Sequence, residues 1–256
     1  MKNELFHLGL LTIHAYGLMI AIGVLIAYKV VVYRAEKRKM ELSPIYGLII
    51  WGLFGGFVGA KLLYWITQIE AIVEQPKMLL DLSSGFVVYG GMIGGIAAGW
   101  LYCKKQRIHF LRHLDLFVPS IALAQGFGRI GCFLAGCCYG EETDHWLGIT
   151  YHESHFAPHD VKLVPTQLFS SVFNFMLFFI LLALARRKRA DGFIAGMYLL
   201  IYSVGRFIIE FFRGDVIRGS VGALSTSQAI AIPVFLCTCI ILIWQVRQFR
   251  GSLVKH

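Results

Sequence analysis

Cationic side chains interrupt three long apolar stretches of the chain. Lys61 stands in GFVGAKLLYW, Arg129 in AQGFGRIGCF and Arg206 in YSVGRFIIEFF. A charge inside a bilayer-spanning helix costs roughly 3 kcal/mol or more, so each of these residues needs a partner or a ligand. Glu210 follows Arg206 by four residues, a spacing that pairs opposite charges on a helix. Arg129 has no carboxylate within one helical turn, which predicts a partner from another helix or an anionic ligand.

These three cations suit a phosphate. Guanidinium groups bind phosphate oxygens through two hydrogen bonds at once, and an ammonium group binds them as a point charge. In a membrane the abundant phosphate belongs to phospholipid headgroups, so the pattern predicts a site for an anionic lipid. Two alternatives remain open: snorkelling of Lys61 to the membrane surface, and a purely structural ion pair between Arg206 and Glu210.

Three cysteines follow Arg129 closely, at Cys132, Cys137 and Cys138. We favour small buried helix residues, and an outward-facing disulfide or a thiol in the reaction is the second interpretation. A metal site is the third, because adjacent cysteines have poor geometry for zinc and no spaced partner pair appears. We therefore predict no metal and no cofactor.

The elements that carry these residues are membrane spans. Hydrophobic residues make up 57% of the chain and charged residues only 15%, whereas a soluble domain has about a quarter charged residues. Apolar runs near 20 residues match the bilayer core. We predict an all-α polytopic bundle of about seven spans, forming a single transmembrane domain over residues 1–256. The expected spans are 13–32, 44–66, 86–103, 116–138, 165–185, 192–212 and 224–246.

Loop charge predicts the orientation of these spans. Basic segments follow the first, third, fifth and seventh spans, while acidic residues gather in the other connections. Because basic loops stay in the cytoplasm, we expect an external N-terminus and a cytoplasmic C-terminus in a bacterial inner membrane. The formal net charge of +9 has the same origin. Nucleic-acid binding would need a basic face on a soluble fold, and none is visible.

The cations share one depth in this arrangement. With a helix rise of about 1.5 Å per residue, Lys61, Arg129 and Arg206 all lie in the outer third of the membrane. Three tyrosines reach the same layer: Tyr16, Tyr89 and Tyr202. The predicted lipid site therefore opens outward.

Glycines gather at four-residue spacing inside the second, third and fourth spans, including 52–59 and 90–99. Small residues at this spacing let membrane helices approach closely, which is the favoured interpretation. Room for lipid beside a site is the alternative.

Seven short motifs, in order along the chain, resemble those of the prolipoprotein diacylglyceryl transferase family. They are AYGLM (15–19), GAKLLY (59–64), VVYGGMIGG (87–95), the long segment from Asp115 to Gly140, VPTQLF (164–169), YSVGRFIIEFFRGD (202–215) and LSTSQ (224–228). Each motif is weak alone, and the ordered set is specific.

This resemblance implies a reaction and its partners. The family moves the diacylglyceryl group of phosphatidylglycerol to the thiol of a lipobox cysteine in the signal peptide of a prolipoprotein. A thioether forms and glycerol phosphate leaves, and the other partners are membrane lipids. Arg129 and Arg206 match the family's essential arginines, which hold the phosphate and stabilise the departing group. Further substrate-binding residues are expected at Lys61, Tyr16, Gly90, Gly91, Gly140, Tyr202, Glu210 and Arg213.

The chain departs from the family pattern at several of these positions. Tyr89 replaces the histidine proposed to accept the thiol proton, and we expect it to take that catalytic role or to bind the phosphate. Cys132 and Cys137 replace an asparagine and a glutamate, and Lys61 replaces an arginine. Two alternatives therefore remain: a family transferase with a different acceptor, and a non-catalytic lipid-binding membrane protein.

Overall fold

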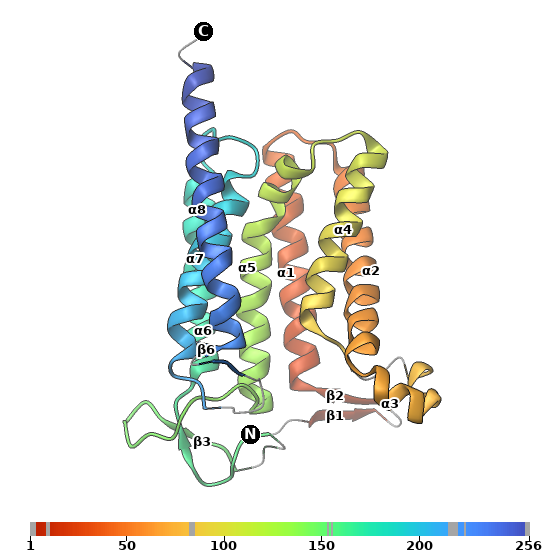
Figure 1. The fold of residues 1–256 in the computed structure, drawn as a ribbon, viewed down its shortest axis with the longest axis vertical. Coiled ribbons are helices and arrows are strands. Elements are labelled where there is room, and N and C mark those ends of the chain that lie inside the picture. Colours follow the sequence, from red (N-terminus) through yellow and green to blue (C-terminus); the bar gives the residue numbers. More distant parts are fainter. Residues whose placement is uncertain are drawn as a thin grey trace. The chain divides into compact units, whose positions relative to one another are not determined.

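The computed structural model describes residues 4–8, 11–81, 85–152, 154, 156–214, 220–222 and 224–253. Each expected span is present in it as a helix, so the all-helical prediction is confirmed (Figure 1). The long helices are α1 (Ala15–Lys37), α2 (Leu42–Thr67), α4 (Val88–Gln106), α5 (Phe110–Ala135), α6 (Thr166–Leu184), α7 (Phe193–Glu210) and α8 (Thr226–Leu253). Two short helical segments, α3 (Ile69–Glu74) and η1 (Pro76–Leu79), lie between α2 and α4.

Six of the described helices are long and apolar enough to cross a membrane. They are α1, α2, α5, α6, α7 and the Thr226–Arg247 part of α8. The helix α4 is not among them, because its glycines and its terminal Lys104 and Lys105 lower its mean hydropathy. The chain is thus a polytopic helical membrane protein, and the seventh span stays a prediction.

Short strands occupy connections between the helices. They form antiparallel pairs: β1 (Glu4–Leu8) with β2 (Leu11–His14), β3 (Ile149–Thr150) with β4 (Lys162–Leu163), and β5 (Ser220–Val221) with β6 (Leu224–Ser225). The sequence analysis did not anticipate them, because runs of two to five residues carry too little periodicity.

The chain divides into two compact units. Unit 1 comprises Met1–Val31 and Leu114–His256, and unit 2 comprises Val32–His113. Unit 2 therefore holds α2 and α4, whereas unit 1 holds α6, α7, α8 and most of α1 and α5.

Glycines bring α2 and α4 into backbone contact within unit 2. A Cβ atom added to Gly59 would lie 2.3 Å from the carbonyl oxygen of Gly90, and one added to Gly94 would lie 2.2 Å from that of Gly55. No side chain larger than hydrogen fits at such separations. The favoured interpretation of the glycine patches, close helix packing, is confirmed for this pair.

The apolar core of unit 1 lies between α5, α6 and α7. It is built from buried residues of all three helices: Val118, Ala122, Leu123, Leu177, Phe178, Leu181, Ile194, Ala195 and Tyr198. The first part of α1 packs on α5, where a Cβ on Gly23 would meet the Cβ of Phe127 at 2.8 Å. Arg129 and Arg206 are carried by helices of this packed unit.

A buried carboxylate ties the start of α7 to α5. The two Asp115 oxygens accept hydrogen bonds from the backbone N–H groups of Gly192 and Ala195, each at 2.8 Å. Gly192 has φ +89°, a conformation that glycine adopts at little cost. The first N–H groups of a helix have no intrahelical partner, and a carboxylate also favours the positive end of the helix dipole. The side chain on α5 thereby fixes where α7 begins.

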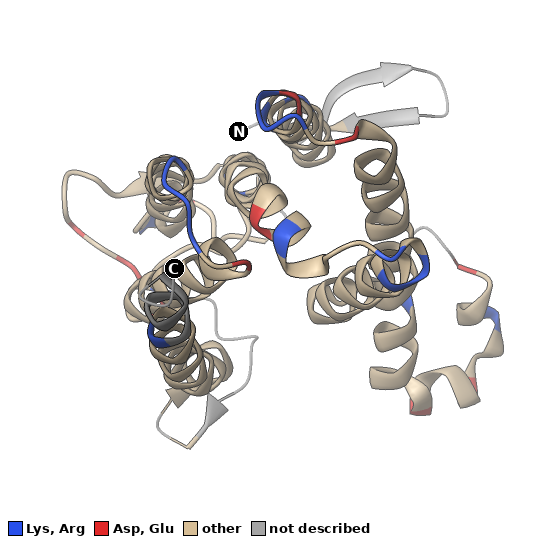
Figure 2. Ribbon diagram, turned by 90° about the horizontal axis from the view of Figure 1, so that it is seen from above, with Lys and Arg blue, Asp and Glu red and all other residues tan. Residues whose placement is uncertain are grey.

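Basic residues mark one end of the unit 1 helices. Figure 2, seen from above, shows Lys and Arg residues in blue on the connection between α6 and α7. Its basic residues are Arg186, Arg187, Lys188 and Arg189, all exposed. In Figure 1 this connection and the C-terminal part of α8 lie at the end of the unit opposite to β3 and β6.

Candidate active site

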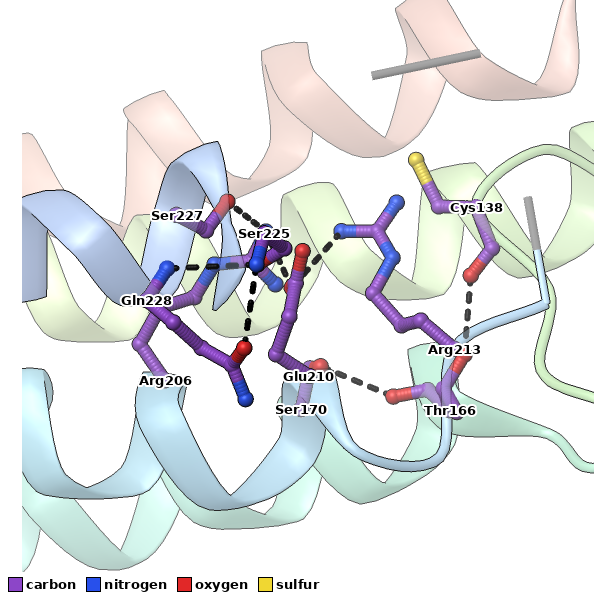
Figure 3. Close-up of polar contacts among 9 residues, drawn as sticks. All are labelled: Cys138, Thr166, Ser170, Arg206, Glu210, Arg213, Ser225, Ser227 and Gln228. Carbon is purple, nitrogen blue, oxygen red and sulfur yellow. Dashed lines mark hydrogen bonds and ion pairs between the residues drawn. The ribbon is translucent and has the colours of Figure 1, made fainter. Parts of the chain in front are cut away.

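Helix α7 and the turn that follows it carry a compact charged triad. Arg206 Nη2 lies 2.8 Å from Glu210 Oε2, and Arg213 Nη1 lies 3.8 Å from the same oxygen. The Glu210 side chain is 6% exposed and that of Arg206 14% exposed, so the pair is largely shielded from water. The predicted pairing of Arg206 with Glu210 is confirmed. Figure 3 shows the carboxylate between the two guanidinium groups.

A second helix, α8, also contacts the Arg206 guanidinium group. Its Nη2 donates a 2.8 Å hydrogen bond to Ser227 Oγ in the first turn of α8. With Glu210 and Ser227 both bound to Nη2, the guanidinium plane is fixed before any ligand arrives. Such preorganisation favours binding, because little rotamer freedom is left to lose. The sequence analysis placed Ser227 in a family motif but gave it no role.

Arg129 and Arg206 line one cavity. The cavity is small, with a volume of about 10 Å³, and its wall comes from α5, α6 and α7. The lining residues are Arg129, Ser170, Phe173, Asn174, Tyr202, Arg206 and Ile209. The lipid-site prediction required the two guanidinium groups to meet, and the structure brings them together. No carboxylate belongs to this lining, so the wall has a net positive charge that suits an anion.

Polar groups of α6 complete the cavity wall. Asn174 Nδ2 donates to the Ser170 carbonyl at 2.7 Å, while its buried Oδ1 has no hydrogen-bond partner among the described residues. Thr166, Ser170 and Asn174 recur every four residues on a mostly apolar helix. That spacing places them on one face and is the signal by which the sequence could have revealed them.

Tyr202 stands beside Arg129 on a packed support. The two side chains line the same cavity. The ring of Tyr202 stacks on that of Tyr198 with centroids 5.4 Å apart, and the Tyr198 hydroxyl donates to Gln125 Oε1 at 2.9 Å. Tyr202 was predicted as a binding residue, and its place in the cavity wall agrees with that expectation.

Gly140 lies where two distant segments pair through their backbones. It forms an isolated bridge with Arg213, and its N–H donates to the Val164 carbonyl at 2.9 Å. A Cβ atom on Gly140 would lie 2.5 Å from the Phe212 carbonyl oxygen. This junction connects the end of α7 to the segment after α5 and thereby places Arg213.

The interpretation of Cys137 and Cys138 as helix residues is wrong. Helix α5 ends at Ala135, because Gly136 adopts φ +71° and reverses the chain. Cys132 lies in the last turn of α5, whereas Cys137 and Cys138 follow the helix, and all three are partly exposed. Hydrogen bonding with the Cys132 and Cys138 thiols, together with burial, raises the pKa of Cys137 above its ordinary value.

Other buried polar side chains support the segment after α5. The Gln167 side-chain N–H group donates to the Cys137 carbonyl at 2.8 Å and to the Tyr151 hydroxyl at 3.2 Å. Tyr151 is 1% exposed, and this burial raises its pKa to about 12. Tyr151 is therefore a neutral packing residue at physiological pH.

Tyr16, at the start of α1, belongs to the same unit as the arginines. A Cβ atom on Gly131 would lie 3.1 Å from its ring, which places the ring against the last turns of α5. Its electrostatic neighbours include Arg129 and the three cysteines. The predicted association of Tyr16 with this region therefore agrees with the structure.

Lys61, Tyr89, Gly90 and Gly91 lie in unit 2. Lys61 is 3% exposed, and its ammonium donates to the Asp81 carbonyl at 2.5 Å. It also lies 5.1–5.9 Å from the ring centroids of Tyr64, Trp65 and Phe86, as cation–π contacts. Lys61 is therefore not a solitary side chain that extends to the membrane surface.

Tyr89 is 45% exposed in the first turn of α4. A joint site of these residues with the arginines of unit 1 stays a prediction.

Comparison with known proteins identifies the family of this chain. Residues 3–244 match the family model for prolipoprotein diacylglyceryl transferase. A protein of Clostridium tetani, named phosphatidylglycerol–prolipoprotein diacylglyceryl transferase, is 48% identical over 98% of this chain and 99% of its own. A relative with the same name and the number 2, from Clostridium perfringens, is 42% identical over 94% and 93%. Another, from Finegoldia magna, is 31% identical over 94% and 92%. The chain therefore belongs to the prolipoprotein diacylglyceryl transferase family.

Proposed function

We propose that this chain transfers the diacylglyceryl group of phosphatidylglycerol to the thiol of a lipobox cysteine in the signal peptide of a prolipoprotein. Its family and the names of its relatives support the reaction class. The observation that carries the proposal for the site is the shared cavity. Arg129 and Arg206 come from different helices and face one space whose lining includes no carboxylate.

The proposed reaction exchanges one bond for another at a glyceryl carbon. The thiol sulfur forms a C–S bond, and the bond from the same carbon to the phosphate oxygen breaks. Glycerol phosphate leaves with the electron pair, and the thiol proton goes to a base. The phosphate changes from a diester with one negative charge to a monoester with a larger negative charge. Donors that are already oriented stabilise this developing charge at no cost of reorganisation.

Arg129 and Arg206 are the residues that we assign to the phosphate. Glu210 and Ser227 would hold Arg206 in its binding orientation, and Tyr202 would hold Arg129. Arg213, beside Glu210, adds positive charge near the same layer. For unit 2 we propose that Lys61, Gly90 and Gly91 contribute to lipid binding and that Tyr89 contacts the reacting groups.

The site is proposed to face outward from a bacterial cytoplasmic membrane. In this arrangement α4 is the third of seven spans and the N-terminus is external. Basic connections at alternate helix ends support this orientation. Lipobox cysteines lie beside a signal peptide that crosses the membrane, so an outer-leaflet cavity lies where both substrates meet.

Reconstitution with defined substrates tests the function. The purified chain would be placed in vesicles containing phosphatidylglycerol and given a lipobox peptide, with the product detected by mass spectrometry. We expect Arg129→Ala and Arg206→Ala each to lower kcat/KM by about 100- to 1000-fold, the usual effect of losing one charge-stabilising donor. Arg187→Ala, on the exposed connection after α6, is the matched control.

The same assay distinguishes the alternatives. Consumption of phosphatidylglycerol without a modified peptide would indicate a different acceptor. Lipid binding without consumption of either substrate would indicate a non-catalytic lipid-binding protein. Full activity of both arginine variants would remove the shared cavity from the mechanism.

A further inference from the structure

Three thiols converge at the outer end of α5. The Sγ atoms of Cys132, Cys137 and Cys138 all lie within 4.8 Å of one another. All three residues are partly exposed and unoxidised, so an ion or a second thiol has access to them. The mechanism described above assigns them no role.

The helix end fixes two of these sulfurs. The N–H of Cys137 donates to the Cys132 carbonyl at 3.1 Å, and the N–H of Gly136 donates to the Phe133 carbonyl at 3.1 Å. These two bonds, with a left-handed glycine between them, make a Schellman motif. The motif connects the backbones of Cys132 and Cys137 directly, so their side chains start from neighbouring positions.

The third sulfur is placed by a strained residue. Cys138 has φ +62°, a left-handed conformation that costs a non-glycine residue about 1 kcal/mol or more. Thr166 Oγ1 donates to its carbonyl at 2.8 Å, and Thr166 is 1% exposed. Figure 3 shows the Cys138 sulfur extending on the opposite side from that carbonyl. Adjacent cysteines in extended backbone point apart, and this conformation instead turns Cys138 toward the others.

Such a trio has the chemistry of a zinc site with one open position. Around Zn²⁺, thiolate sulfurs stand about 2.3 Å from the metal, and hence about 3.8 Å from each other in a tetrahedron. Sulfurs within 4.8 Å reach that geometry through small side-chain rotations. No histidine or carboxylate among the described residues joins the group, so the fourth position is left to a ligand.

The site adjoins the arginine cavity. Cys132 follows Arg129 by one helical turn on α5, and Arg129 interacts electrostatically with both Cys132 and Cys138. A metal centre with three thiolates carries a net negative charge, which a neighbouring guanidinium stabilises. An acceptor bound to the metal would therefore stand beside the phosphate that Arg129 is proposed to hold.

We propose that Cys132, Cys137 and Cys138 bind Zn²⁺ and that the open position takes the thiol of the acceptor cysteine. This inference rests on the proposed function. On coordination the acceptor thiol releases its proton to water and becomes a metal-bound thiolate. That sulfur forms the C–S bond, the C–O bond to phosphate breaks, and the thioether leaves the metal. The metal changes no oxidation state.

Metal analysis of the purified full chain tests the binding step without using turnover. We expect about one Zn²⁺ per chain, retained in Cys237→Ser and lost in Cys132→Ser and in the triple serine variant. Cys237 lies in α8 and is the matched control. Thermal unfolding shows whether the serine variants remain folded. A chain that binds no zinc, or equal zinc binding by the triple variant, would overturn the proposal.

Cobalt substitution tests the open position. Co²⁺ in a thiolate site absorbs through charge transfer, and adding the lipobox peptide should intensify this band because a fourth thiolate binds. A peptide with serine in place of the cysteine is the control. An unchanged spectrum with the cysteine peptide would contradict acceptor binding. Arg129→Ala is expected to keep zinc and lose turnover, so failure of the transferase function is distinguishable from failure of the metal site.

Discussion

Glu210 lies within 4 Å of the guanidinium groups of both Arg206 and Arg213. It neutralises part of the charge on Arg206 and at the same time fixes the direction of that side chain. A buried carboxylate beside an anion site opposes ligand binding through repulsion, yet it keeps the empty site from holding two uncompensated cations. Glu210 does not belong to the cavity lining. It therefore compensates the charge of the cations without standing directly against a bound anion.

Replacing Glu210 by glutamine tests this positioning role. Glu210→Gln keeps the size of the side chain and removes the negative charge of its ion pair with Arg206. We expect kcat/KM to fall by about 10- to 100-fold because Arg206 loses its fixed orientation. Steady-state assays in phosphatidylglycerol vesicles measure the effect, with the exposed Glu142→Gln as control. Wild-type kinetics in Glu210→Gln would show that Ser227 alone suffices.

Asn174 permits an electrostatic test of the cavity. Asn174→Asp changes one atom type in the wall that Arg129 and Arg206 share. The added carboxylate competes with phosphate for the guanidinium groups, so we expect phosphatidylglycerol affinity to fall tenfold or more. Titration with a short-chain phosphatidylglycerol measures this, and Asn174→Ala should have a smaller effect. Equal affinity for Asn174→Asp and the wild type would mean that the phosphate binds elsewhere.

Among the helices, α2 and α4 depend on each other most directly, because no side chain separates their backbones at Gly59 and Gly90. Gly59→Ala would place a Cβ 2.3 Å from a carbonyl oxygen. We expect it to destabilise the chain by about 1–3 kcal/mol through overpacking. Gly52→Ala, on the same helix with nothing within 4 Å, should be neutral or slightly stabilising. Thermal unfolding in detergent compares the two, and equal Tm values would contradict the packing argument.

The sequence predicted the helices well because a membrane span is a local signal. Each expected span has its helix, and Arg129 and Arg206, the charged interruptions, line one cavity. The turn at Gly136 was missed, since the apolar run continues beyond it and only the positive φ reveals the end of α5. The contact of Lys61 with Phe86 and the hydrogen bond from Arg206 to Ser227 were missed because they join residues from separate segments. The prediction of no metal rested on the poor zinc geometry of adjacent cysteines and on the lack of a spaced partner pair. The left-handed φ of Cys138, which bears on the first of these reasons, could not be read from the sequence.

At the scale of the whole molecule, the charge pattern predicts which connections meet the cytoplasm. Single cysteines would be introduced at Arg187, after α6, and at His145, after α5, both exposed. In intact cells a membrane-impermeant thiol reagent should label His145→Cys and leave Arg187→Cys unmodified until the cells are opened. A background variant without the introduced cysteine corrects for native thiols. Labelling of Arg187→Cys from outside would invert the proposed orientation.

The bond from Asp115 to the start of α7 has a geometric consequence for the two arginines. Arg129 lies fourteen residues after Asp115 (129 − 115), and Arg206 lies fourteen residues after Gly192 (206 − 192). Both helices rise about 1.5 Å per residue from that common origin, so the Cα atoms of both arginines lie about 21 Å along their helices from it. The two arginines therefore lie at equal depth because each follows the Asp115 contact by the same number of helical residues. The length of the loops has no influence on this depth. Inserting a single alanine between Asp115 and Arg129 would shift Arg129 alone along its helix by about 1.5 Å and rotate it by about 100° about the helix axis.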